Sequence, residues 1–227
     1  MKNYILTGIL VVILASCSTK NTINVTIKGV PDGRKAYLKK QKDRKIIVLD
    51  STVIKNEKFG FNFTNDEPII VGIFVDSIKQ GLFPLVSKND IVHITAQKDS
   101  LFFAKITGSK LNDELTSLRK FRDSVGKQIM ALSAPFRKAQ QAKDTITLKK
   151  LNDQARKIQG IINKHDWDYI KANPNSYVSP LVLSGLVRDF MYKDSVKMAF
   201  DKLSEKVKSS EISKGLREYF EKNKPKK

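Results

Sequence analysis

The side chains that most often carry out chemistry are few in this chain. Its 227 residues include one cysteine, Cys17, and two histidines, His93 and His165. A single thiol excludes an intramolecular disulfide, a Cys-x-x-Cys redox pair and a metal site built from several thiolates. Two histidines far apart in the sequence argue against a histidine-rich metal centre, so both are expected to pack inside the fold or at its edge.

Motifs for nucleotide binding and acyl transfer are also missing from the sequence. It has no Gly-x-x-x-x-Gly-Lys loop, no Gly-x-Gly-x-x-Gly turn and no Gly-x-Ser-x-Gly elbow. Asp166 and Asp168 are close, but two such positions on a helix lie roughly 200° apart and do not make an obvious acid/base pair. The sequence therefore predicts no enzymatic activity, no catalytic residue, no metal and no cofactor. An enzyme with an unrecognised carboxylate site is the alternative.

The N-terminus has the plan of a secretory signal peptide. Lys2 supplies a positive charge, residues 4–14 form an uncharged apolar run, and small residues follow. The apolar run is too short to span a membrane, which takes about 20 residues. We therefore expect a signal peptide over residues 1–16.

The chemistry expected of Cys17 is attachment of lipid. Leu14-Ala15-Ser16-Cys17 resembles the bacterial lipobox, which implies cleavage before the cysteine and acylation of its thiol. Ser18 stands where an Asp would usually mean inner-membrane retention, and no acidic run follows. We expect residues 17–21 to be a lipidated tether at the periplasmic face of the outer membrane. An incidental cysteine behind an ordinary signal peptide is the alternative.

Residues 22–108 are expected to form an antiparallel β-sandwich-like domain. Polar and apolar residues alternate over residues 22–28, and Phe59, Phe61 and Phe63 alternate so that all three share one face. About eight such segments follow one another with short turns, which is typical of an antiparallel sandwich or barrel.

Residues 109–227 are expected to form a helical domain with a long helical hairpin, which makes the fold class α+β. Ser109 can cap a first helix whose apolar residues recur every three or four positions until Pro135 kinks or ends it. A polar bend over residues 137–143 leads to a second helix over 144–172. We expect the two helices to pack against each other and against the sandwich. Shorter helices are expected over residues 181–187, 194–208 and 212–223.

Three stretches together resemble a known family. They are Asp50-Ser51-Thr52-Val53-Ile54-Lys55-Asn56-Glu57-Lys58-Phe59-Gly60-Phe61, Ile106-Thr107-Gly108-Ser109-Lys110-Leu111-Asn112-Asp113-Glu114-Leu115, and Tyr169-Ile170-Lys171-Ala172-Asn173-Pro174-Asn175-Ser176-Tyr177-Val178-Ser179-Pro180-Leu181-Val182-Leu183. They resemble the domain of unknown function at the N-terminus of bacterial thiol-disulfide interchange lipoproteins, although that family usually has Gly where Glu57 stands.

The resemblance implies a companion module and not a redox enzyme. In longer relatives a thioredoxin-like domain with a Cys-x-x-Cys follows, and this sequence ends about where that domain would begin. A dithiol couple needs two thiols, and the single thiol here is expected to carry lipid. The three stretches themselves are interpreted as a turn, a helix start and a helix stop.

The chain is strongly basic, with a net charge of +19, and both halves share the excess. The densest cluster lies on an expected hairpin and contains one acid, Asp43: Arg34, Lys35, Lys39, Lys40, Lys42, Arg44 and Lys45. It is a candidate surface for anionic lipid, anionic glycan or an acidic partner, with a merely solvated hairpin as the alternative. Nucleic acid is not expected as a partner, because the predicted address lies outside the cytoplasm.

A bacterial O-glycosylation pattern, Asp followed by Ser or Thr and then an aliphatic residue or Thr, recurs along the chain. The candidate acceptors are Ser51, Ser77, Ser100, Ser124, Thr145 and Ser195. The alternative is that these Asp-Ser and Asp-Thr pairs serve as caps and turns.

Together these features predict a non-enzymatic binding or scaffolding module, held at the outer membrane by its N-terminal lipid. The expected partner is an envelope protein, of redox or transport type. The alternatives are a binder of anionic envelope glycan or lipid that uses the basic hairpin, and the enzyme considered above.

Overall fold

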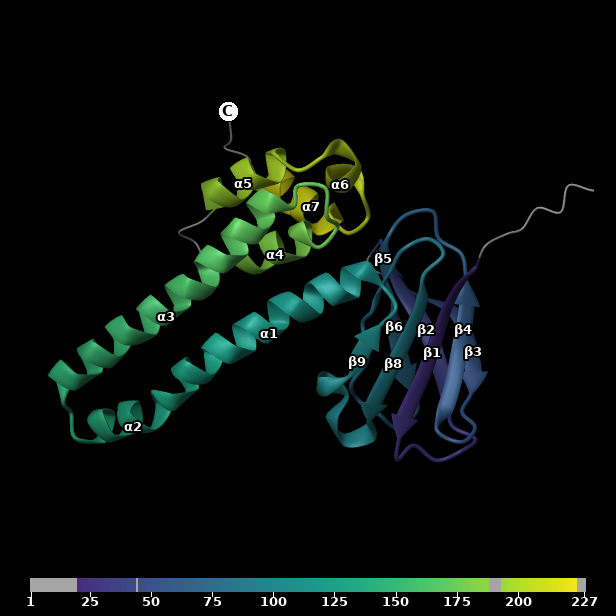
Figure 1. Cartoon of the computed structure of the whole chain (residues 1–227), viewed down its shortest axis with the longest axis horizontal. Helices are drawn as coiled ribbons and strands as arrows, with labels where there is room; N and C mark the ends of the chain where they lie inside the picture. Colours follow the sequence, from purple (N-terminus) through teal and green to yellow (C-terminus); the bar gives the residue numbers. More distant parts are fainter. Residues whose placement is uncertain (1–19, 44, 188–192, 224–227) are drawn as a thin grey trace, which may run out of the picture.

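The computed structural model describes residues 20–43, 45–187 and 193–223. The expected signal peptide, Cys17 and Arg44 lie outside the described residues, and so does all of the expected tether except its last two positions. Strands fill the first half of the chain and helices the second (Figure 1). The predicted α+β class is therefore confirmed.

Two sheets face each other in the strand-rich half. The larger one contains, in order, β4 (Lys58–Phe63), β1 (Asn21–Lys28), β8 (Ile91–Gln97) and β9 (Lys105–Thr107). The smaller one contains β3 (Lys45–Val53), β2 (Lys35–Lys42) and β6 (Gly72–Val75). A short third sheet pairs β5 (Ile69–Ile70) with β7 (Leu85–Val86).

One strand pair departs from the antiparallel pattern that the sequence predicts. β1 runs parallel to β8, with Thr22 opposite Ile91 and Lys28 opposite Gln97, whereas the pairs β1–β4, β2–β3, β2–β6, β5–β7 and β8–β9 are antiparallel. Alternation of polar and apolar residues sets which face of a strand is buried, and it is the same for a parallel or an antiparallel neighbour.

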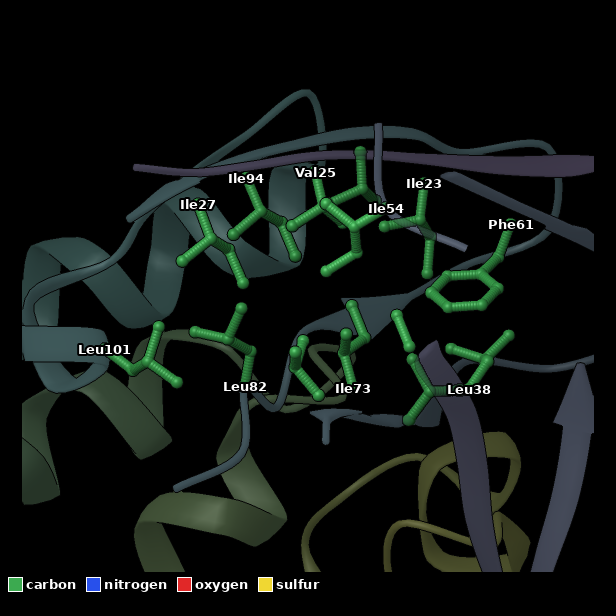
Figure 2. Close-up of a cluster of buried hydrophobic side chains, with 14 of the residues drawn as sticks. Ile23, Val25, Ile27, Leu38, Ile54, Phe61, Ile73, Leu82, Ile94 and Leu101 are labelled. Atoms are coloured by element: carbon green, nitrogen blue, oxygen red, sulfur yellow. The ribbon is translucent and has the colours of Figure 1, made fainter. Parts of the chain in front are cut away.

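The core of the sandwich lies between the two larger sheets. Figure 2 shows Ile23, Val25 and Ile27 of β1 opposite Ile73 and Leu38 of the smaller sheet. Burying one such aliphatic side chain stabilises the fold by about 1.5–3 kcal/mol. The alternating phenylalanines of β4 behave as predicted, because all three pack against this core and Phe61 is fully buried.

The strand expected over residues 102–107 is replaced in part by a short helix. Residues Lys98–Phe103 form a 3₁₀ helix, η1, that buries Leu101 and leaves Phe102 and Phe103 exposed. A short apolar run does not by itself distinguish a strand from a buried turn of helix.

The predicted long helices are present, but the break between them lies elsewhere. α1 (Lys110–Ala131) stops before Pro135, α2 (Ser133–Gln141) includes that proline, and α3 (Thr145–Ala172) follows. Proline has no N–H and its ring clashes with the carbonyl four residues earlier, here that of Ala131, so the chain breaks at Leu132. The bend predicted over residues 137–143 lies later in the chain, because α2 continues through Gln141 and α3 begins at Thr145.

The outer half of this hairpin, residues 123–161, forms an arm. α1 contacts the sandwich at β7 and β9. The inner ends of α1 and α3 belong to a second hydrophobic core, formed by the helices and here called the helical core. The buried side chains of the arm are Val125, Ala139 and Ile158, and they belong to neither of the two large cores. The arm extends away from both (Figure 1). The two long helices pack against each other as predicted. The prediction that they also pack against the sandwich is wrong for the arm.

Four short helices cover the inner end of α3. They are α4 (Ser179–Leu186), α5 (Lys193–Asp201), α6 (Glu205–Ser209) and α7 (Lys214–Lys222). Their core centres on Leu183, Val196 and Leu216, and the helix expected over 194–208 is divided near Leu203. Among the described residues, no helix combines the length and the apolar character that crossing a membrane requires.

Candidate binding groove

An open groove of about 1270 Å³ lies between the end of the sandwich and the start of α7. Residues of β2, β3 and β4 and of the segment 64–74 form one wall, and residues 211–218 form the other. Pockets for small ligands are usually about 300–1,000 Å³ and enclose most of the ligand. A space this large and this open fits a segment of polypeptide better than a small molecule.

The floor of the groove is built around the ring of Phe74. Phe83 lies edge-on to this ring, with 5.7 Å between centroids, and the Lys39 ammonium lies 5.0 Å from the ring centroid. Gly72 and Gly81 approach the same ring so closely that a Cβ would stand 2.6 Å and 2.8 Å from it. The ring is therefore held in place by neighbours that have no room for a side chain, and the lysine adds a cation–π contact.

Aliphatic side chains extend this apolar surface towards an open strand edge. Ile46, at the start of the edge strand β3, is 70% exposed, and Phe83 is 57% exposed. Ile70 also lines the groove and is partly exposed. Exposed apolar side chains gathered at one site are typical of surfaces that bind a partner.

Charged groups of both signs surround the apolar floor. Lys39, Lys40 and Lys42 lie on the β2 side, and Glu211 and Glu218 lie on the α7 side. One ion pair joins the two walls: the Lys214 ammonium lies 2.5 Å from an oxygen of Asp43, in the turn between β2 and β3. Both groups are in contact with water, so this pair adds little to stability. Its role is to link the two walls of the groove.

The pair between Asp43 and Lys214 predicts a measurable titration. A hydrogen bond from Lys214, and then its charge, holds the pKa of Asp43 below the ordinary value of 3.8. The contact is therefore intact at neutral pH and is lost as the pH falls through this lowered pKa. In an NMR titration we expect the midpoint of the Asp43 carboxyl to lie below 3.8 in the wild type. In the variant Lys214→Gln we expect this midpoint to rise. Lys79→Gln, on an exposed lysine outside the groove, is the control and should leave it unchanged. An Asp43 midpoint that is the same in Lys214→Gln would contradict the contact.

The structure brings together only part of the basic cluster that the sequence singled out. Lys39, Lys40 and Lys42 line the groove, and Lys45 pairs with Lys42 across the hairpin. Arg34 and Lys35 lie at the opposite end of β2, about 20 Å away at the usual rise of a strand, where Arg34 donates a hydrogen bond to Ser77. A role for the cluster in binding anions stays a prediction.

The six candidate glycosylation sites are spread over both halves of the chain. Ser51, Ser77, Ser124, Thr145 and Ser195 are exposed, and Ser100 is half-buried in η1. One Asp of these pairs has a structural role: Asp144 caps α3 by accepting a hydrogen bond from the Thr147 N–H at 3.0 Å. Glycosylation at any of the six stays a prediction.

The side chains of Asp166 and Asp168 in α3 point in different directions, which is what the sequence predicts. Asp166 is buried and receives two hydrogen bonds from the Arg122 guanidinium, at 3.1 and 2.8 Å. Asp168 points outward to Lys164, and the His165 ring stacks on Phe121 with 3.7 Å between centroids. His93 is exposed in β8. In the part of the chain that the structure describes, no three His, Cys, Asp or Glu side chains are grouped as a metal site would require.

Two polar contacts, one buried and one partly buried, were not found by reasoning from the sequence. Asn112 lies in the first turn of α1, and its amide both accepts from the Leu85 N–H at 3.0 Å and donates to the Leu85 carbonyl at 2.7 Å. This clasp fixes the first helix to β7. Nothing in the sequence marks Asn112, since a polar residue in a first helical turn is usually exposed.

The second contact joins two of the stretches that carry the family resemblance. The Glu114 carboxylate accepts hydrogen bonds from the Tyr169 and Ser176 hydroxyls, and Ser176 Oγ also accepts from the Val178 N–H. Burial, and then the Glu114 carboxylate, raise the pKa of the Tyr169 phenol above its ordinary value of 10.0, so it keeps its proton at a higher pH than an exposed phenol does. The network ties α1 to the end of α3 and supports the structural interpretation of both stretches.

Part of the chain matches a protein-family model. No curated protein and no solved structure matches the chain. The family match ends in the second turn of α1, so the groove wall formed by residues 211–218 and nearly all of the helical half lie beyond it. Residues 21–115, which include every strand that the structure describes, match the family model described as Domain of unknown function (DUF4369).

Proposed function

We propose that this protein is a lipid-anchored envelope protein that binds a protein partner in the groove and has no catalytic role. Cys17 would carry the lipid and hold the molecule at the periplasmic face of the outer membrane. The lipobox resemblance and the short apolar run before it support this anchoring.

The observation that carries the binding role is the apolar floor of the groove. Phe74, Phe83 and Ile46 form an open surface beside an edge strand, with charged side chains around it. Apolar centres with polar rims are the usual composition of protein interfaces. The resemblance to the domain that accompanies thioredoxin-like lipoproteins favours a partner from the redox or transport proteins of the envelope.

The acidic groups that could serve as catalysts have other roles. Asp166 is paired with Arg122, and Glu114 already accepts from two hydroxyls. A general base needs a free lone pair directed at a substrate. These contacts favour a binding module over an enzyme.

The anchor is tested by fractionation of cells that express the whole chain. We expect Cys17→Ala to leave the membrane fraction or to accumulate with its signal peptide uncleaved, because no thiol remains to carry lipid. A Cys17→Ala protein that fractionates and migrates like the wild type would show that the chain is not a lipoprotein.

The groove is tested by photo-crosslinking in the same cells. A photo-reactive residue at Phe83 should give one discrete adduct with an envelope protein. The same residue at Met198, which is 63% exposed on α5 and outside the groove, should not. Equal adducts from both positions, or a polysaccharide adduct from Phe83, would contradict a protein-binding groove.

A further inference from the structure

The outer face of the first half of α3 is strongly basic, and its side chains are exposed in the part of the chain that the structure describes. Its cations are Lys149, Lys150, Arg156 and Lys157, and all four are exposed. At 100° per residue they fall within roughly 120° of the helix circumference, opposite the buried Ile158. We call these four cations and the two isoleucines beside them, Ile146 and Ile161, the basic face.

The cations of the basic face form two parallel rows. Lys149 and Arg156 are seven residues apart, as are Lys150 and Lys157, so each row spans two helical turns, about 10 Å. None of the four forms an ion pair with any residue that the structure describes. Asp153 is the acid between them, and Asp144, just before the helix, is occupied by capping Thr147. Four positive charges therefore face solvent around one carboxylate, Asp153, and the Lys150 charge also acts on Asp144, so the face keeps a positive excess.

Apolar side chains are exposed beside these charges. Ile146 is 70% exposed and Ile161 is 50% exposed. A Cβ added at the neighbouring Gly160 would meet nothing within 4 Å, so the face is open along this stretch. Helices at the interface of an anionic membrane combine cations that attract the headgroups with aliphatic side chains that enter the acyl boundary.

The position of the face also suits a broad, flat ligand. It lies on the arm, which stands clear of the sandwich and of the helical core (Figure 1). The exposed face of a helix is convex, so it does not enclose a small anion. An extended anionic surface can reach all four cations at once.

We propose that the basic face of α3 binds the surface of a bilayer that contains anionic phospholipid. The four cations contact headgroup phosphates, and Ile146 and Ile161 enter the boundary between headgroups and acyl chains. Such binding needs neither lipid on Cys17 nor an occupied groove, so it is independent of the function proposed above.

The test is co-sedimentation of the chain from residue 20 onward, which keeps both cores, with lipid vesicles. We expect binding to vesicles of phosphatidylglycerol and phosphatidylethanolamine, loss of binding to pure phosphatidylcholine, and weakening as salt is raised. Neutralising the four cations to Gln should lower the partition coefficient about 600-fold, since each cation near an anionic surface contributes about fivefold.

A matched control separates the basic face from net charge alone. Gln at Lys28, Lys79, Lys88 and Lys105, exposed lysines of the sandwich half, removes the same charge and should leave binding within about twofold. Ile146→Ser with Ile161→Ser should remove the part of the binding that persists at high salt. Equal losses in both charge variants, no binding by the parent chain, or binding to soluble polyglutamate in place of vesicles would overturn the proposal. Unchanged melting temperatures confirm that all variants are folded.

Discussion

Asn112→Ala is expected to lower the free energy of unfolding by about 2–5 kcal/mol, because it leaves the buried N–H and C=O of Leu85 without partners. Each orphaned buried polar group costs about 1–3 kcal/mol. A domain has only about 5–15 kcal/mol in total, so the variant should be close to unfolding at 37 °C. Chemical denaturation monitored by circular dichroism gives the value directly.

The control for this prediction is Asn152→Ala. Asn152 lies in the interior of α3 with its side chain exposed, so the same truncation should change the stability by less than about 0.5 kcal/mol. Similar midpoints for both variants would mean that the clasp between α1 and β7 does not stabilise the junction. Hydrogen exchange at the Leu85 amide should also rise in Asn112→Ala.

Arg122→Ala is expected to cost about 3–5 kcal/mol, because it strands a buried carboxylate. The Asp166 side chain is 6% exposed and the Arg122 side chain is 38% exposed. His165 Nδ1 lies 3.9 Å from the carboxylate and makes no hydrogen bond to it, so the acid depends on the arginine for its hydrogen-bonded ion pair. The double variant Arg122→Met with Asp166→Leu should recover most of the loss, since it removes the charge and the partner together.

The pair Lys164–Asp168 on the same helix provides the comparison. Its side chains are 77% and 60% exposed, so Lys164→Ala should cost no more than about 0.5 kcal/mol. If Arg122→Ala and Lys164→Ala have equal effects, or if the double variant is less stable than Arg122→Ala, burial does not determine the value of these ion pairs.

The sequence predicts the elements of this fold better than their partners. Alternation in β1 and β4 and the three-or-four spacing in α1 and α3 identify the buried faces, because burial acts on each element locally. The parallel neighbour of β1 and the free position of the arm depend on the rest of the chain. Ser109 shows the same limit: it stands at the N-cap position, as predicted, but its hydroxyl makes no capping hydrogen bond.

The groove could not be predicted because it is made by segments far apart in the sequence. Phe74 and Phe83 are unremarkable apolar residues of a strand-rich segment, and Glu211 and Glu218 are polar residues near a terminal helix. Their meeting depends on how the helical half packs beside the sandwich. The basic face of α3 was within reach of the sequence, since its four cations repeat with the period of a helix that was expected.

The parallel pairing of β1 with β8 determines when the sandwich can fold. β1 lies between β4 and β8, and its parallel partner follows roughly 70 residues later. During synthesis or export β4 can cover one edge of β1 first, but the other edge stays open until Gln97 has emerged. Contacts of such long sequence separation slow folding, to about milliseconds or seconds, and prolong the exposure of strand edges. Thr22, Asn24 and Thr26, which occupy the more exposed face of β1, give this strand one polar side during that interval.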